Sequence, residues 1–244
     1  MQEQTSEPRV LGIVPARGGS KGISRKNIRL LNGKPLLAYT AGAARKSTRL
    51  SRVLLSTDDP EIAEIGKSVG LDVPFFRPAE LALDATPMIE VVLHAVRWAQ
   101  AQGENYDAIC LLQPTSPLRS AETIDRCLSR LWEGETDSVV SVRPVRPEYN
   151  PHWVYFQTHE GLLKPSMGES DPIPARQLLP AAFHRDGSVF AAKMQCVLLH
   201  GSLYGSRTAG VVSPEGEACD LDTEEQWELL ERNLRSMSNL ASAR

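Results

Sequence analysis

The chain has 244 residues, 41% of them hydrophobic, and its formal net charge is −3. This length suffices for one large α/β domain with a substantial core. The charge argues against a general nucleic-acid binder, which needs a strongly basic surface, and no apolar run approaches the roughly 18 residues that a membrane span requires.

The N-terminus and the cysteines indicate a cytoplasmic protein. Residues 1–9 are polar and lack the apolar centre of a signal peptide, so we expect a disordered tail there. The four cysteines are far apart and form no C-x-x-C pair, which favours neither a zinc site nor a redox motif. Reduced thiols in a cytoplasm fit this pattern best.

A basic, glycine-rich loop follows the first apolar run of the chain. Residues 10–14 read as a buried strand, and the loop after it contains Arg17, Gly18, Gly19, Lys21, Gly22, Arg25 and Lys26. Glycines let backbone amides turn inward, and such amides together with fixed cations suit a polyphosphate. The alternative is a solvated basic loop. The spacing matches neither a Walker A loop nor the dinucleotide pattern G-x-G-x-x-G.

The remaining pattern alternates between strands and helices. Apolar runs predict strands over 53–55, 73–76, 109–112, 138–142, 187–192 and 211–212. Helical faces are predicted over 35–46, from Pro60, from Thr86-Pro87 with Thr86 as the cap, around 124–131, and after Thr223. This order predicts an α/β fold with a mostly parallel sheet, as one domain over 10–240.

Polar side chains follow two of these strands. Asp58 and Asp59 end the strand over 53–55, and we expect Asp59 to cap the next helix while the role of Asp58 stays open. Gln113 ends the most apolar strand and offers an amide to a ligand. His94 lies within a helix, where a packed or solvated histidine is a better interpretation than a catalytic one.

The segment over 144–180 breaks the periodicity. It holds seven prolines and four aromatic residues, Tyr149, Trp153, Tyr155 and Phe156. Flexible linkers are poor in aromatic residues, so four aromatic side chains argue against a linker here. We therefore expect an extended arm with a β-hairpin over 153–156 and 162–164, which packs on a partner subunit or covers a substrate.

An acidic motif, Asp220-Leu221-Asp222-Thr223, comes late in the chain. In an extended segment both carboxylates point to one side, and two oxygen ligands can hold Mg²⁺ beside a triphosphate. The alternative is that Asp222 or Thr223 caps the final helix, which explains one acid but not both. Cys219 beside this motif is interpreted as structural.

Several segments in this order resemble the acylneuraminate cytidylyltransferase family, the CMP-sialic acid synthetases and their relatives. They are PARGGSKGISRKN, STDD, RPAEL, LQPTSPLR, the stretch from Arg176 to Gly187, and DLD. The resemblance covers about residues 9–235. It implies a Rossmann-like nucleotidyltransferase fold with a dimerisation arm, a Mg²⁺ cofactor, and reaction of CTP with an anionic sugar acid to give a CMP-sugar and pyrophosphate.

The resemblance also implies roles for individual residues. Arg17, Lys21, Asp220 and Asp222 are the catalytic residues, and the two aspartates are the metal ligands. Nucleotide binding falls to Ala16, Arg17, Gly18, Ser20, Lys21, Lys26, Asn27, Arg77 and Thr86. Acceptor binding falls to Gln113, Arg176, Phe183 and Arg185. The family further implies a homodimer in which each site is completed by the neighbouring subunit.

Two positions depart from the sialic acid enzymes that this chain resembles. Those enzymes have a lysine where this chain has Trp153 and an arginine where it has His184, and Arg185 could replace the missing cation. The acceptor alternatives are therefore N-acetylneuraminate, a legionaminic- or pseudaminic-type acid, and a smaller anion such as a phosphonate. A different nucleoside triphosphate and a non-catalytic nucleotide-binding module remain as rival interpretations.

Overall fold

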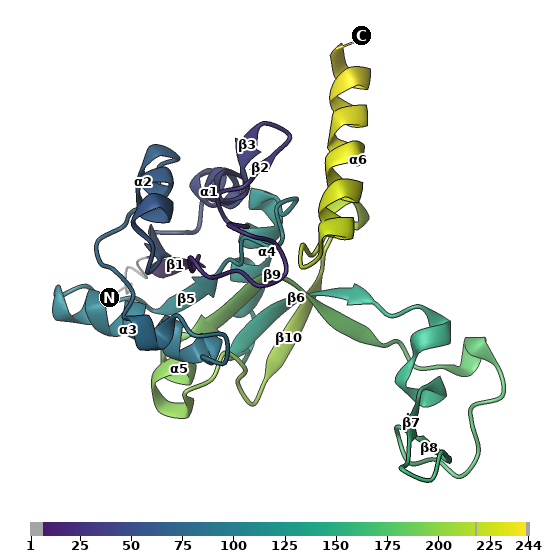
Figure 1. Ribbon diagram of the computed structural model, residues 1–244. Helices are drawn as coiled ribbons and strands as arrows, with labels where there is room; N and C mark the ends of the chain where they lie inside the picture. Colours follow the sequence, from purple (N-terminus) through teal and green to yellow (C-terminus); the bar gives the residue numbers. More distant parts are fainter. Residues whose placement is uncertain (1–6, 218, 243–244) are drawn as a thin grey trace. The chain divides into compact units, whose positions relative to one another are not determined.

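The computed structural model describes residues 7–217 and 219–242. The chain forms two compact units, a larger one that runs through Ser141 and resumes at Asp186, and a smaller one over Val142–Arg185. The smaller unit contains the range 144–180 that was expected to form an arm. Figure 1 shows the elements of both units along the chain.

A six-stranded, mostly parallel sheet organises the larger unit. Its strands stand in the order β10-β6-β9-β5-β1-β4, and β1 runs parallel to both β4 and β5, whereas β9 is antiparallel to β5. The strands are β1 (Val10–Pro15), β4 (Arg52–Ser56), β5 (Ala108–Leu111), β6 (Ser138–Pro144), β9 (Phe183–Lys193) and β10 (Thr208–Val212). The predicted run over 109–112 is central, as its apolar composition indicated.

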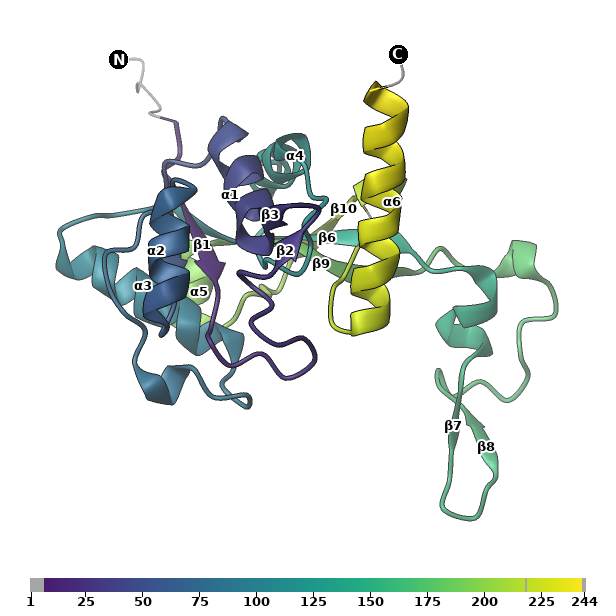
Figure 2. The same ribbon diagram turned by 45° about the horizontal axis from the view of Figure 1, so that its top comes forward.

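Helices cover both faces of this sheet. In Figures 1 and 2, α1, α2 and α4 lie on one face, and α3 and α5 lie on the other. The helices are α1 (Leu36–Lys46), α2 (Pro60–Ser68), α3 (Met88–Ala101), α4 (Ala121–Leu131), α5 (Met194–His200) and α6 (Glu224–Ser242).

All six residues of β1 are buried, and successive side chains serve opposite faces. Val10 and Val14 belong to the core cluster shared with α1 and α4. Leu11 lies with Val96 and Ala99 of α3 around a small cavity on the opposite face. The strand is therefore fixed from both sides, as a strand inside a parallel sheet should be.

The prediction of a strand over 73–76 is wrong. On the side of β4 away from β1, this part of the chain pairs with β4 through an isolated bridge between Leu54 and Asp72. Pro74 has no N–H to give to a sheet, and the ring of Phe75 packs edge-on against His94, with centroids 4.8 Å apart. This contact also makes His94 a packed histidine.

Two helix starts differ from the prediction by one residue. Pro35 and Pro87 are the N-caps of α1 and α3 rather than their first helical residues. Thr86 does not cap α3, because its hydroxyl donates to the carbonyl of Glu80 at 3.2 Å. Asp59 does cap α2 as expected, accepting the Ile62 N–H at 3.0 Å. Helix α5 was not predicted.

A two-residue hairpin precedes α1. Strands β2 (Leu30–Leu31) and β3 (Lys34–Pro35) pair in antiparallel fashion around Asn32 and Gly33, which have φ values of 47° and 79°. Positive φ at both central residues is what such a tight hairpin requires. The predicted turn is thus confirmed.

The chain is already ordered at Arg9, inside the predicted tail. Its N–H donates to the Asp107 carboxylate at 2.7 Å, and its guanidinium lies 4.8 Å from the ring centre of Tyr106. Residues 1–6 lie outside the described part of the chain.

Helix α6 is anchored by a second, smaller core. Leu221, Trp227 and Leu230 pack with Ile23, Leu31 and Leu36. Thr223 caps the helix reciprocally with Gln226: its hydroxyl accepts the Gln226 N–H at 3.3 Å, and the Gln226 side chain accepts the Thr223 N–H at 3.0 Å. Capping therefore occupies Thr223 and leaves the Asp222 carboxylate available.

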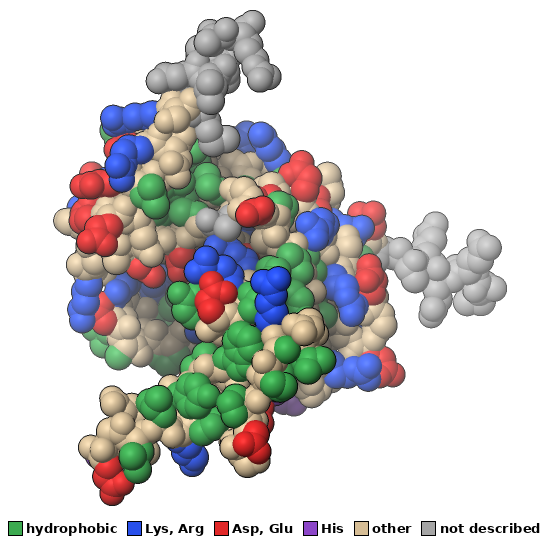
Figure 3. All heavy atoms as spheres, turned by 90° about the vertical axis from the view of Figure 1, so that its right-hand side faces the viewer, with side chains coloured by type: hydrophobic (Ala, Val, Ile, Leu, Met, Phe, Trp, Pro, Cys, Tyr) green, Lys and Arg blue, Asp and Glu red, His purple; other side chains and the backbone are tan. Residues whose placement is uncertain are grey.

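The smaller unit is built around the predicted hairpin. Strands β7 (Tyr155–Gln157) and β8 (Leu163–Pro165) pair in antiparallel fashion. The Trp153 indole donates to the carbonyl of Ile173 at 2.8 Å. Large hydrophobic side chains are exposed on this unit, and Figure 3 shows them gathered in green; they are Tyr149, Val154, Tyr155, Phe156, Leu162, Leu163, Met167, Leu178 and Phe183.

Candidate active site

A cavity of about 380 Å³ opens at the carboxyl ends of β1 and β5. In open α/β sheets this edge is where ligands bind. Its lining combines residues from motifs more than 200 positions apart, namely Pro15, Arg17, Ser20, Lys21, Gly22, Lys26, Asn27, Arg77, Met88, Gln113, Pro114, Thr115 and Asp222. In Figures 1 and 2 the loop after β1 reaches the base of α6.

Three of the four cations of the loop, Arg17, Lys21 and Lys26, contact carboxylates at the cavity. Arg17 Nη2 and Lys21 Nζ each lie 2.5 Å from one oxygen of Asp84. Lys26 Nζ lies 2.9 Å from Asp222 Oδ1 and donates to the carbonyl of Leu221 at 2.7 Å. Two acids from distant segments, Asp84 and Asp222, therefore offset part of the positive charge of the loop.

Backbone contacts hold the loop in shape. The Gly18 N–H donates to Asp58 Oδ1 at 3.0 Å, and Ala16 N–H donates to the carbonyl of Ser56 at 2.9 Å. Buried Asn27 donates from its amide to the carbonyl of Arg17 at 3.0 Å. Asn27 thus supports the loop from beneath, while Asp58 holds an amide that could otherwise face an anion.

Gly22 permits the closest approach between the loop and the acidic motif. A Cβ at this position would lie 2.2 Å from the carbonyl oxygen of Asp222. A Cβ at Gly19 would meet nothing within 4 Å. Of these two glycines, only Gly22 is therefore demanded by packing.

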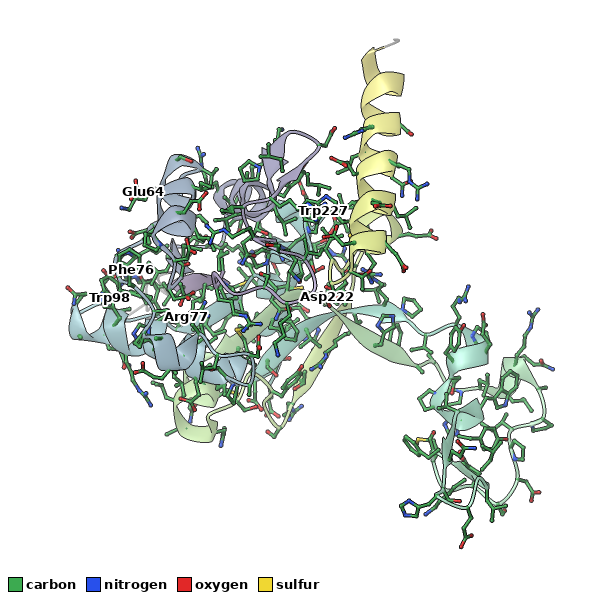
Figure 4. All side chains as sticks on the ribbon, viewed as in Figure 1. Glu64, Phe76, Arg77, Trp98, Asp222 and Trp227 are labelled. Atoms are coloured by element: carbon green, nitrogen blue, oxygen red, sulfur yellow. The ribbon has the colours of Figure 1, made fainter. Side chains whose placement is uncertain are left out.

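Arg77 is the buried cation of the cavity. It is 5% exposed, and its guanidinium donates to the hydroxyl and the carbonyl of Ser56. Burial lowers the pKa of Arg77 to about 10, so it stays charged at neutral pH. Figure 4 labels Arg77 and Asp222, both of which line this cavity. Thr86 does not line it, and Met88 does.

Gln113 lies in a turn that Arg119 fixes. The buried Arg119 guanidinium donates to the carbonyl of Gln113 at 3.2 Å and to that of Ser188 at 2.6 Å. Gly187, with φ of 78°, brings backbone close to the Gln113 amide. The backbone of Gln113 is therefore held in place at the cavity. Gly187 has no side chain that would crowd the Gln113 amide.

The two aspartates of the acidic motif lie beside different cavities. Leu221 between them is fully buried, and both acids are exposed, as alternation predicts. Asp222 lines the loop cavity, whereas Asp220 lines a neighbouring one of about 390 Å³ with Leu118, Cys219 and Leu230. The described conformation thus brings only Asp222 to the phosphate loop.

The donor set still fits Mg²⁺. No group of three or more His, Cys, Asp or Glu in the described residues comes together as a metal site. Mg²⁺ seldom uses such a cage, because it keeps several waters and takes one or two carboxylates together with substrate phosphates. An exposed aspartate beside a phosphate-type loop meets that requirement.

Three predicted acceptor residues belong to the smaller unit. Arg176, Phe183 and Arg185 are all exposed there. Trp153, where the family resemblance expects lysine, is half-buried and hydrogen-bonded within the same unit.

The cysteines form no disulfide, and three of them lie inside the fold. Cys110, Cys127 and Cys196 are buried. Burial raises the pKa of each of these three thiols, to about 12 for Cys127.

Sequence reasoning missed Asp84, the acid that contacts two loop cations. It left Asp58 open, and Asp58 accepts from Gly18. Asp58 follows a strand in the STDD motif, so its position gave a signal. Asp84 lies in an irregular connection with no periodicity, and only the tertiary structure reveals its partners.

A fold of this kind, with a basic loop and an acid at the strand ends, defines a nucleotide-binding α/β enzyme. The sequence profile of the family described as Cytidylyltransferase matches residues 11–232. The chain therefore belongs to the cytidylyltransferase family, which confirms the expected family, the fold class and a nucleotidyltransferase that uses CTP.

Two curated relatives are similar over most of their length. The CMP-N,N′-diacetyllegionaminic acid synthase of Legionella pneumophila is 33% identical over 92% of this chain and 95% of that protein. The pseudaminic acid cytidylyltransferase of Campylobacter jejuni (serotype O:2) is 30% identical over 87% of this chain and 90% of that protein.

A solved structure shares the fold at low identity. A CMP-2-keto-3-deoxy-manno-octonic acid synthetase complexed with CTP superposes with a TM-score of 0.69, over 94% of this chain and 99% of that chain, at 14% identity. This likeness concerns the fold alone. None of the helices in the described part of the chain has the length and apolarity to cross a membrane.

Proposed function

We propose that this protein transfers CMP from CTP to a nonulosonic, sialic-acid-like sugar acid and releases pyrophosphate. The observation that carries the proposal is the cavity that Arg17, Lys21, Arg77, Gln113 and Asp222 line together. These residues come from four separate segments of the sequence: the glycine-rich loop, RPAEL, LQPTSPLR and DLD. The names of the relatives from Legionella and Campylobacter support the substrate class.

In the proposed reaction, a hydroxyl oxygen of the acceptor attacks the α-phosphorus of CTP in line. A new O–P bond forms, the bond from the α-phosphorus to the bridging oxygen breaks, and the hydroxyl proton passes to solvent. The protein's task is positioning and charge stabilisation rather than covalent catalysis. Arg17 and Lys21 stabilise the charge that develops on the departing pyrophosphate.

The proposal includes Mg²⁺ held by Asp222, with Asp220 as the second carboxylate. The bound ion would supply charge neutralisation at the phosphates and a lower pKa for the attacking hydroxyl. Asp222 is suited to this role because Thr223, not Asp222, caps α6. Lys26 keeps the Asp222 carboxylate at the cavity.

Ser20 and Lys26 would bind the triphosphate, supported by Ala16, Gly18 and Asn27. Arg77 would lie at the nucleoside, with Thr86 in the connection before α3. Gln113 would bind the acceptor, and Arg176, Phe183 and Arg185 are proposed as further acceptor-binding residues.

The proposal also includes a homodimer formed through the smaller unit. Its exposed hydrophobic residues, with Phe156, Leu162 and Leu163 each more than 60% exposed, form the kind of surface that a partner covers. A cytoplasmic location fits four cysteines that form no disulfide.

The test is pyrophosphate release with Mg²⁺ and CTP across a panel of acceptors. The panel holds legionaminic and pseudaminic acids, N-acetylneuraminate, 3-deoxy-octulosonate and small phosphonates, with ATP, GTP and UTP run in parallel and EDTA as the metal control. Release with CTP and a nonulosonate, abolished by EDTA, is the expected result.

Other outcomes correct particular parts of the proposal. Release with a different nucleotide would overturn the cytidine assignment, and release only with a phosphonate would overturn the acceptor class. Turnover that survives EDTA would remove the metal. Binding of CTP without release for any acceptor would favour the non-catalytic module.

A further inference from the structure

The Asp84 carboxylate contacts Arg17 and Lys21, the two cations that the proposed reaction assigns to the departing pyrophosphate. One of its oxygens lies 2.5 Å from Arg17 Nη2 and the other lies 2.5 Å from Lys21 Nζ. Arg17 is held further by the same segment, since its Nη1 donates to the carbonyl of Ala82 at 3.3 Å. A carboxylate with one oxygen on each cation matches the way a phosphate group would bridge them.

The segment that carries Asp84 is attached only loosely to the core. None of its residues from Ala82 to Ala85 is buried, and Leu83 is 63% exposed. Its local hydrogen bonds include those from the Ala82 N–H to the carbonyl of Ala79, from the Thr86 N–H to the carbonyl of Leu83, and from the Thr86 hydroxyl to the carbonyl of Glu80. Moving this segment would therefore expose little additional apolar surface.

The ion pairs themselves can be exchanged. The Lys21 side chain is 78% exposed and that of Asp84 is 41% exposed, and exposed pairs contribute little because water screens them. Lys21 and then Arg17 lower the pKa of Asp84, so the carboxylate is ionised at neutral pH. A polyphosphate with several negative charges would compete successfully for the same cations.

We propose that Asp84 is an internal counter-anion, which neutralises Arg17 and Lys21 in the free enzyme, yields them to the triphosphate, and returns when pyrophosphate leaves. This inference rests on the proposed function, because it takes the loop as the triphosphate site. Asp84 is then a positioning residue that acts through Arg17 and Lys21. It also adds selectivity, since a single small anion must displace a carboxylate already bound at two points.

The proposal is tested by whether removing the Asp84 charge strengthens or weakens the binding of pyrophosphate. In Asp84→Asn, we expect the dissociation constant of inorganic pyrophosphate and the KM for CTP both to fall by about two- to tenfold, the scale of losing one or two exposed ion pairs. The KM for the acceptor stays unchanged, and kcat does not rise because pyrophosphate leaves more slowly. The differences shrink with added salt. Pyrophosphate binding is measured by calorimetry, without acceptor.

Glu80→Gln is the matched control, since it removes an exposed carboxylate four residues away that has no ion pair to the loop among the contacts of the described residues. It should bind pyrophosphate as the wild type does. Asp84→Glu keeps the charge and should restore wild-type affinity. Melting temperatures of all three variants confirm that each is folded.

Weaker or unchanged binding of pyrophosphate in Asp84→Asn would overturn the inference, because a ligand-binding or purely structural role weakens affinity. Lys21→Ala separates this result from failure of the proposed function. If Lys21→Ala binds pyrophosphate like the wild type, the loop is not the phosphate site and both proposals fall. If Lys21→Ala loses pyrophosphate binding while Asp84→Asn binds pyrophosphate like the wild type, only the counter-anion proposal is contradicted.

Discussion

Asp222 is the residue on which the proposed chemistry depends most directly. Its carboxylate is 64% exposed and paired with Lys26, so it contributes little to the core. We predict that Asp222→Ala abolishes turnover and leaves the melting temperature nearly unchanged, because the metal-binding oxygen is lost and no packing is removed. Initial rates and thermal unfolding check both parts.

Asp220→Ala is the companion variant. A loss of rate comparable to that in Asp222→Ala would mean that Asp220 moves to the metal during the reaction. Near-normal rates in Asp222→Ala itself would remove the metal role from this motif.

At this scale the sequence predicted the cations of the loop but not all their partners. Arg17, Lys21 and Lys26 stand in a recognisable glycine-rich motif, and the structure brings all three to one cavity. Asp84 could not be predicted, since its pairing arises from tertiary packing of an irregular connection. Thr86 was misjudged as a cap because its hydroxyl has a nearer carbonyl at Glu80.

The loop after β1 and the acidic motif fit together through Gly22. We predict that Gly22→Ala lowers stability by about 1–3 kcal/mol and reduces activity sharply, because its Cβ would overlap the Asp222 carbonyl oxygen at 2.2 Å. Gly19→Ala, in the same loop but with no neighbour within 4 Å, is the control and should unfold like the wild type. Equal melting temperatures for the two variants would contradict the close approach.

The N-cap of helix α2 should make a pH-dependent contribution to the free energy of unfolding. Asp59 accepts the Ile62 N–H, and its ion pair with Arg25 lowers the pKa of the carboxyl below its ordinary 3.8. The Asp59 charge therefore stabilises the fold fully at a pH above the pKa that Asp59 has in the unfolded chain. This stabilisation is lost as the pH falls through the lower pKa that Asp59 has in the folded protein.

We expect Asp59→Ala to cost about 1–2 kcal/mol at pH 7 through the lost cap. Asp59→Asn keeps a capping oxygen and should cost less, within about 1 kcal/mol for a partly exposed pair. Urea unfolding at pH 7 and below pH 4 checks this, since the gap between wild type and Asp59→Asn should narrow in acid. A gap that widened would contradict the sign.

At the scale of elements, apolar runs predicted the central strands well because β1 and β5 are buried along their whole length. The segment over 73–76 also looked apolar, yet Pro74 and the packing of Phe75 on α3 keep it out of the sheet. The antiparallel direction of β9 could not be read from composition, because strand direction depends on how the chain returns to the sheet.

For the whole molecule, we predict a dimer that depends on the smaller unit. Phe156→Asp and Leu163→Asp place charges on side chains that are each 65% exposed, so folding should survive while association weakens. Light scattering after size-exclusion chromatography measures the mass. Leu199→Asp on α5, a 68% exposed leucine of the larger unit, is the control and should remain dimeric. A wild type that runs as a monomer at every concentration would contradict the prediction.

The proposed active site joins residues from opposite ends of the chain. Lys26 and Asp222 are 196 positions apart, and Leu221 completes a core whose other members include Ile23 and Leu31. At a synthesis rate of about 5–20 residues per second, the loop would leave the ribosome roughly 10–40 s before its acidic counterpart. During translation the proposed active site thus cannot close until nearly the whole chain has emerged, and a chain terminated before Asp222 would carry the basic loop without the aspartate needed to use a nucleotide.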